Sequence, residues 1–422
     1  MEGLDVSMIS TAILLPLFAV TCWAILKQPL GIDGAWWAVL AGVGSLAVGL
    51  VSPQEAGVAL GQTVDVLTFF GGLLVLAAVL NRAGAVDWLM DRLEAWAGSS
   101  TKRLLVGILV LTALLTAVLS NDAAALLLAP AVVQRVRGRG LAPAPFLLGL
   151  AVVTNSASLL LPISNPVNLL LLDRDHLPFS QYITTVTPGA MAGLLLTSLV
   201  VVALMWHHPA RITPATTRPR SSNTHLLAAL AGLVAVLALA DVVLVLLGKS
   251  LGPPTALASL IALMMLGRLQ PGAGMEALKQ ARWTLLPLVV GLAILSAGLQ
   301  QSHVLNGVLT SVAGGSAGLL GLARVGAATA ALAAAVNNLP AAFLVGAGLA
   351  ATHHLSSFTI PVIVGADLGP NLAPAGSLST ILAFSAGDGP RERPSLTSFF
   401  RVGWVAGPAG LLVTLLVVGL VR

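Results

Sequence analysis

Long apolar runs separated by short polar segments follow one another along most of this chain. Residues 7–26, 34–51 and 64–80 form the first three runs, and each is long enough to cross the apolar core of a bilayer as a helix. From residue 81 to residue 102, charged residues alternate with Trp and Leu, a pattern typical of an amphipathic helix at the membrane surface. No basic leader precedes residues 7–26, so we expect a first span there rather than a cleavable signal peptide.

The next apolar stretch is interrupted by the polar residues Ser120, Asn121 and Asp122. Its two arms, residues 104–119 and 123–136, are both short, and the first would be about 24 Å long as a helix. Because Lys and Arg favour the cytoplasmic side and flank both outer ends, the pattern predicts a re-entrant hairpin with Asn121 and Asp122 at its tip. The alternative is one full span with a polar kink, which would put one basic cluster on the wrong side. The flanking residues are Lys102, Arg103, Arg135, Arg137 and Arg139.

Two later apolar stretches contain residues that an unbroken membrane helix does not tolerate. Residues 365–380 read GADLGPNLAPAGSLST, with Asp367 at the start of the break, and residues 154–168 read TNSASLLLPISNPVN. Proline removes a backbone donor and clashes with the preceding turn. The freed backbone groups persist at membrane depth only when they are buried in protein or face a wet cavity. We therefore expect two helices that unwind inside the membrane.

The two halves of the chain repeat the same order of elements. When residues 154–168 are laid on residues 366–380 without gaps, Asn155 falls on Asp367 and Pro162 falls on Pro374. A second polar tip, Asn337-Asn338, follows Asn121-Asp122. The separation of the two tips along the chain is nearly the same as that of the two broken segments, and it pairs Asp122 with Asn338. Two broken segments at matching places in two halves are typical of a transporter site. The other spans expected are residues 182–206, 226–247, 255–266, 283–299 and 399–421.

These patterns predict an all-α polytopic membrane protein of two inverted-topology repeats. Each repeat contains a re-entrant hairpin and a broken transmembrane helix, which gives about ten spans and two hairpins. Residues 1–206 form the first repeat, residues 207–224 a cytoplasmic linker, and residues 225–422 the second repeat.

The basic residues predict the orientation. With the first hairpin on the cytoplasmic side, the 21 Lys and Arg residues all fall on that side except Arg174, Lys249, Arg324 and Arg422. This distribution predicts a multi-pass protein of the cell (inner or plasma) membrane with both termini outside.

Composition excludes several other classes of protein. The chain is 57% hydrophobic and 9% charged with a mean hydropathy of +0.96, so the net charge of +5 is not a nucleic-acid signal. Cys22 is the only cysteine, which rules out an intrachain disulfide or a cluster of thiol ligands. We find no phosphate-binding GxxxxGK[ST], no HExxH and no catalytic triad spacing, and expect no enzyme activity, no metal site and no cofactor.

Asp122 and Asp367 are the two carboxylates placed deepest in the membrane. A charge at that depth costs at least ~2.5–3.5 kcal/mol, so a buried carboxylate is by default a functional hypothesis, and both are candidates to carry a proton. The alternative is that each caps the half-helix that follows it.

Amides and hydroxyls at the tips and breaks complete the candidate substrate site. The alternative for each asparagine is turn chemistry, and for each serine a bond to its own helix backbone. Neither break contains Arg or Lys. The predicted substrate-binding residues are Asn121, Asp122, Asn155, Ser158, Ser164, Asn168, Asn337, Asn338, Asp367, Asn371 and Ser377.

At these motifs the chain resembles the ArsB family of arsenite/antimonite efflux proteins in the ion transporter superfamily. The resemblance rests on the Ser120-Asn121-Asp122 tip, residues 155–168, residues 337–340 and, above all, residues 365–380, which together span both halves. It implies export of trivalent arsenic or antimony in exchange for protons, and a peripheral arsenite-stimulated ATPase is a partner known in that family.

The residues suit this chemistry, because arsenite near neutral pH is mainly an uncharged trihydroxide that amides, hydroxyls and carboxylates can bind. The alternatives are a sodium/proton antiporter, or a carboxylate or silicate transporter, of the same superfamily.

Overall fold

The computed structural model describes residues 6–205, 223–300, 303–314, 318–350, 357–389 and 392–421, and within these ranges it contains helices and no strand. Nine of the described helices are long and apolar enough to cross a membrane. This number differs from the ten predicted spans because it includes two hairpin arms and leaves out several helices shorter than a full span. All but the last two residues of the predicted linker, 207–224, lie outside the described residues.

The first three spans form where the apolar pattern places them. They are α1 (Val6–Lys27), α2 (Gly34–Ala47) and α3 (Pro53–Arg82). Helix α3 begins at Pro53 rather than at residue 64, because a capping box fixes its first turn. Ser52 Oγ accepts from the Glu55 N–H at 3.1 Å, and Glu55 Oε2 accepts from the Ser52 N–H at 2.8 Å.

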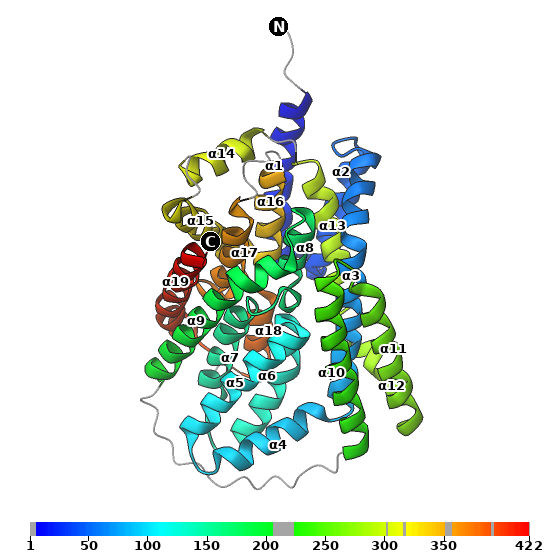
Figure 1. The fold of residues 1–422 in the computed structure, drawn as a ribbon, viewed down its shortest axis with the longest axis vertical. Coiled ribbons are helices and arrows are strands. Elements are labelled where there is room, and N and C mark those ends of the chain that lie inside the picture. Colours follow the sequence, from blue (N-terminus) through cyan, green and yellow to red (C-terminus); the bar gives the residue numbers. More distant parts are fainter. Residues whose placement is uncertain are drawn as a thin grey trace.

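The first hairpin is confirmed. Helices α5 (Thr101–Leu119) and α6 (Asn121–Gly138) meet at Ser120, whose φ of 107° breaks the helix. Amphipathic helix α4 (Ala85–Ala97) leads into α5, and the far end of α6 is also bound to α4 by ion pairs. The two outer ends of the hairpin therefore lie on the same side of the molecule, where Figure 1 places α4.

The first broken span is also confirmed. Helix α7 (Pro143–Ala157) ends, a short 3₁₀ turn η2 (Pro162–Ser164) follows, and α8 (Pro166–Arg174) continues to the loop before α9 (Phe179–Met205). Asn165 is the N-cap of α8, and its Oδ1 accepts from the Val167 N–H at 3.1 Å.

The second half follows the same order, with α14 as a helix that the apolar pattern did not predict. In Figure 1, α14 and α4 lie at opposite ends of the molecule. The described helices and turns of the second half are α10 (Thr224–Leu246), α11 (Gly252–Leu269), α12 (Ala273–Gln280), α13 (Leu285–Ala297), α14 (His303–Ala313), α15 (Leu319–Val336), α16 (Asn338–Ala350), α17 (Thr359–Leu368), η4 (Gly369–Asn371), η5 (Pro374–Gly376), α18 (Leu378–Ser385) and α19 (Leu396–Val421).

Backbone geometry shows where the broken segments of the two halves correspond. The turn η2 begins at Pro162 and the turn η5 begins at Pro374, the two prolines that the sequence comparison pairs. The N-caps that follow these turns, Asn165 and Ser377, fall on one another in the same register. The expected register of the breaks is therefore confirmed.

The expected register of the hairpin tips was wrong by one residue. Positive φ occurs at Ser120 in the first tip and at Asn337 in the second, whereas the sequence comparison paired Asn121 with Asn337. Asp122 therefore corresponds to Leu339 rather than to Asn338. The inverted orientation of the halves stays a prediction.

Two pairs of helices that contribute to the fold around the tips pack closely against one another. Helix α2 packs against α13, and α3 packs against α11. At the first contact, a Cβ added to Gly42 would lie 2.6 Å from the Gly291 carbonyl oxygen, and one added to Gly291 would lie 2.3 Å from the Ala38 carbonyl carbon. Glycine is required there because two helix backbones touch, as is common between membrane helices.

Candidate substrate site

Both hairpin tips and both broken segments meet around one cavity of about 360 Å³. The tips contribute Asp122 from α6 and Asn337 and Asn338 from the second hairpin, while the breaks contribute Asn165 and Leu378. The rest of the wall comes from the α1–α2 turn, the middle of α3 and the start of α13. A polar cavity at the meeting point of broken helices and hairpin tips is the arrangement expected of a transporter binding site.

The two tips present their polar groups differently. At the first tip, Asn121 Oδ1 accepts from the Asp122 N–H at 2.8 Å, which leaves the half-buried Asp122 carboxylate in the cavity wall. At the second tip, Asn338 Oδ1 accepts from the Leu339 N–H at 2.9 Å, and Asn337 Nδ2 donates to the Ala375 carbonyl at 3.2 Å. Asn337 therefore fastens its tip to the second break.

Asn155 joins the two breaks and does not line the cavity. Its Nδ2 donates to Asn371 Oδ1 and to Thr380 Oγ1, both at 3.0 Å, and its Oδ1 accepts from Ser379 Oγ at 3.0 Å. Asn371 Nδ2 in turn donates to Ser156 Oγ at 3.1 Å. These fully buried amides hold the broken segments at a fixed distance from one another.

Three of the predicted substrate-binding serines form hydrogen bonds to other groups of the protein. Ser158 Oγ donates to the Asn155 carbonyl at 2.6 Å, and Ser164 Oγ donates to the Ala117 carbonyl of α5 at 3.1 Å. Ser377 caps α18 and shares a hydrogen bond of 2.6 Å with Ser379. Of these three, only Ser158 bonds the backbone of its own helix, as the alternative reading expects, and the substrate-binding role of all three stays a prediction.

Asp367 lies behind the cavity wall, with 1% of its surface exposed. Its Oδ1 accepts from Asn165 Nδ2 at 2.6 Å, and its Oδ2 has no hydrogen-bond partner among the described residues. Asn168, one turn along α8 from Asn165, also has a buried Oδ1 without a partner in the described part of the chain. Asn165 therefore links a fully buried carboxylate to the cavity.

The helix-capping alternative is wrong for both aspartates. Asp367 lies on the last turn of α17, and the N-cap of the following α18 is Ser377. Asp122 lies in the first turn of α6, whose N-cap is Ser120. A carboxylate in a first turn still gains from the helix dipole.

Arg282 is a cavity residue that sequence reasoning missed. It directly precedes the segment that leads into α13, and it lines the cavity with Asp122. The broken segments themselves contain no Arg or Lys, as expected, but tertiary packing brings this one to them. No local signal in the sequence separates Arg282 from the other basic residues between the apolar runs.

The described residues contain no group of three or more His, Cys, Asp or Glu side chains that could hold a metal ion. Cys22 is buried in α1 one turn from Ile25 and Leu26, which line the cavity, but Cys22 itself does not. The cavity is therefore built from oxygen and nitrogen groups and apolar side chains.

Comparison with known proteins identifies the family. The profile of the citrate transporter family matches residues 17–366. The chain belongs to this family. Family membership and the apolar helices together identify the chain as a multi-pass membrane transporter of a small molecule in the ion transporter superfamily.

Two proteins are similar to this chain in sequence, and one solved structure is similar to it in fold. The arsenical pump membrane protein of Escherichia coli is 27% identical over 418 residues, which cover 94% of this chain and 96% of the relative. The silicon efflux transporter LSI3 of Oryza sativa subsp. japonica is 29% identical over 143 residues, or 34% of this chain and 29% of the relative. The crystal structure of the Alcanivorax borkumensis YdaH transporter matches the fold with a TM-score of 0.60 at 16% identity over 98% of both chains.

Proposed function

We propose that this transporter exports a trivalent metalloid, arsenite or antimonite, from the cytoplasm in exchange for protons. It would do so in the cell membrane with both termini outside. The observation that carries the proposal is the cavity between the tips and breaks, with a few polar groups in its wall, in a chain similar along nearly its whole length to an arsenical pump. A peripheral ATPase partner remains part of the proposal through the family resemblance.

The cavity chemistry supports an uncharged hydroxylated substrate. The amides of Asn165, Asn337 and Asn338 and the carboxylate of Asp122 lie in its wall together with apolar side chains. Amides both donate and accept, and a carboxylate accepts from hydroxyl groups, so together they match a trihydroxide. Few precisely placed polar groups in a mostly apolar wall are the usual composition of a small-molecule site.

Asp367 supports the proton half of the exchange. A proton on Oδ2 would remove a buried charge whose second oxygen has no donor among the described residues. It would also weaken the charge-assisted bond from Asn165, the residue that both caps α8 and faces the cavity. Protonation of Asp367 would therefore change the substrate site through one intervening side chain.

A second candidate substrate class is silicate or a carboxylate. The similarity to a silicon efflux transporter over 143 residues favours silicate, and the citrate transporter family favours a carboxylate. A sodium/proton antiporter of the superfamily could use the same two aspartates.

The proposal is tested by uptake of labelled arsenite, antimonite, silicate and citrate into inverted vesicles that contain the protein. We expect arsenite and antimonite to accumulate when the vesicle interior is acidic, and the accumulation to collapse when the pH gradient is dissipated. Accumulation of citrate or silicate alone, or dependence on sodium instead of protons, would refute the assignment.

Replacing Cys22 with Ser should leave arsenite uptake by inverted vesicles unchanged. The thiol is buried in α1 outside the cavity wall, and the proposed ligands are oxygen and amide groups. Loss of uptake in a variant that is expressed at the wild-type level would indicate thiol coordination of arsenic instead.

A further inference from the structure

Arg282 places a cationic donor in the cavity wall with part of its hydrogen-bonding capacity unused. Its Nη1 is buried and has no hydrogen-bond partner among the described residues. A guanidinium stays charged and offers five N–H donors in a fixed plane. A buried donor of this kind is expected to find a partner, so an unpaired one in a cavity wall points to a group that arrives from outside the chain.

Two buried arginines elsewhere in the fold have the carboxylate partners that partly buried Arg282 lacks among the described residues. Arg135 forms ion pairs with Asp91 and Glu94, and Arg139 forms one with Glu94. Arg282 interacts electrostatically with Asp122 across the same cavity, yet no ion pair joins the two in the described part of the chain. Arg282 and Asp122 thus line one cavity without an ion pair between them among the described residues.

One further charged side chain faces this cavity. Asp33 lines the wall at the start of α2, where its Oδ1 accepts from the Ala35 N–H at 2.9 Å. Two carboxylates and one guanidinium together do not favour a polyanion, because like charges in a partly desolvated site repel strongly. They suit a neutral or singly ionised molecule that donates to a carboxylate on one side and accepts from a guanidinium on another.

We propose that Arg282 binds an oxygen of the substrate through its free Nη1 while Asp122 accepts from one of the substrate's hydroxyl groups. The substrate class is then small weak oxoacids that carry at least one acceptor oxygen and one hydroxyl. Arg282 itself cannot ligate a bare metal cation, because a guanidinium has only N–H donors and no acceptor to offer. This assignment rests on the proposed function for its choice of arsenite as the first ligand.

The test is ligand-induced thermal stabilisation of the purified full-length protein in detergent, with arsenite and citrate as separate probes. At a fixed ligand concentration, a ligand that binds only the folded state raises the melting temperature further the more tightly it binds. We expect Arg282→Gln to weaken arsenite binding at least tenfold and Arg282→Lys to weaken it less, since lysine keeps the charge and loses the planar fork. Arg268→Gln, an exposed change at the end of α11 outside the cavity wall, is the matched control and should bind as the wild type does.

The melting temperature without ligand separates a binding role from a structural one. Because no ion pair joins Arg282 to a carboxylate in the described part of the chain, Arg282→Gln should melt close to the wild-type temperature. A lower temperature together with unchanged arsenite affinity would assign Arg282 to structure and overturn the inference.

The two probes also separate this inference from the proposed function. If the wild type binds citrate and not arsenite, and Arg282→Gln loses that binding, the metalloid assignment fails while Arg282 remains the residue that binds substrate oxygen. Wild-type protein that binds neither probe would overturn both.

Discussion

Replacing Asp367 with Asn is expected to abolish arsenite accumulation driven by a pH gradient in inverted vesicles. Asn preserves the size of the side chain and an acceptor for the Asn165 amide, but it cannot take up and release a proton. Because the carboxylate is buried and one of its oxygens lacks a donor among the described residues, its charge state should control the local structure. We therefore expect folded protein that still binds arsenite and no longer concentrates it.

The measurement is initial uptake with an acidic vesicle interior, compared with arsenite binding by the purified variant. Asp122→Asn should have a similar or milder effect, since Asp122 lines the cavity directly. Asp388→Asn, an exposed aspartate paired with Arg137, is the matched control and should transport normally. If both Asp367→Asn and Asp122→Asn retain gradient-driven uptake at the wild-type level, neither aspartate is the obligatory proton carrier.

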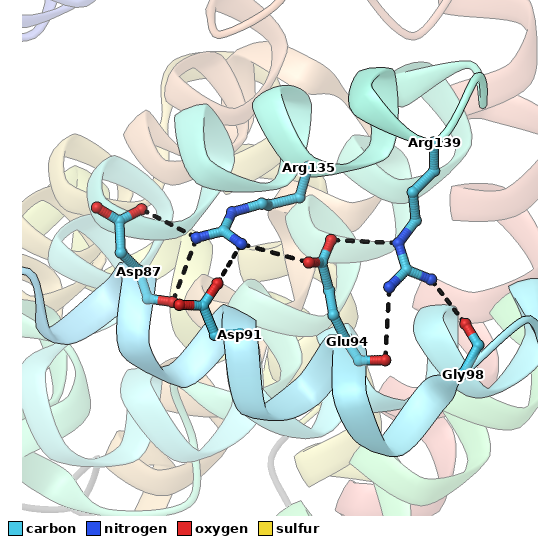
Figure 2. A network of polar contacts seen from close by, with 6 residues as sticks. All are labelled: Asp87, Asp91, Glu94, Gly98, Arg135 and Arg139. Carbon is cyan, nitrogen blue, oxygen red and sulfur yellow. Dashed lines mark hydrogen bonds and ion pairs between the residues drawn. The ribbon is translucent and has the colours of Figure 1, made fainter. Parts of the chain in front are cut away.

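Replacing Glu94 with Ala is expected to lower the stability of the protein by about 3–5 kcal/mol, the usual effect of removing one member of a buried ion pair. Figure 2 shows the network, in which Glu94 on α4 lies between Arg135 and Arg139 of the first hairpin. Its Oε2 accepts from Arg135 Nη1 at 3.3 Å and its Oε1 accepts from Arg139 Nε at 3.2 Å, and all three side chains are at most 7% exposed. The substitution leaves Arg139 without a carboxylate among the contacts drawn in Figure 2.

The measurement is the apparent melting temperature in detergent. Glu276→Ala is the control, since Glu276 pairs with Arg82 where both side chains are about half exposed, and loss of an exposed pair changes stability by about 0–1 kcal/mol. Because the network fixes the end of the hairpin whose tip carries Asp122, Glu94→Ala should also reduce transport. Equal melting temperatures for the two variants would show that the network does not hold the hairpin to α4.

The interruptions of the apolar runs were predictable because their causes are local. Prolines combined with nearby polar or glycine residues, as around Pro162 and Pro374, favour a break in a membrane helix, and the polar residues around Ser120 and Asn337 mark the tips. The basic residues at the outer ends of α5 and α6 predicted a hairpin in place of a single span, which the ion pairs to α4 confirm. Short apolar stretches were less informative about where helices form. Helix α14 was not predicted, and the true start of α3 is set by its N-terminal cap rather than by the apolar pattern.

The sequence by itself therefore determined the class of protein, the positions of the breaks and tips, and the polar residues near them, because each depends on neighbours within a few residues. Only the tertiary structure decided which of those residues share the cavity. Asn155 joins the two breaks, Asp367 lies behind Asn165, and Arg282 reaches the cavity from just before the start of α13. These relations join residues far apart in the chain, and they follow from how whole helices pack rather than from the preferences of any one segment.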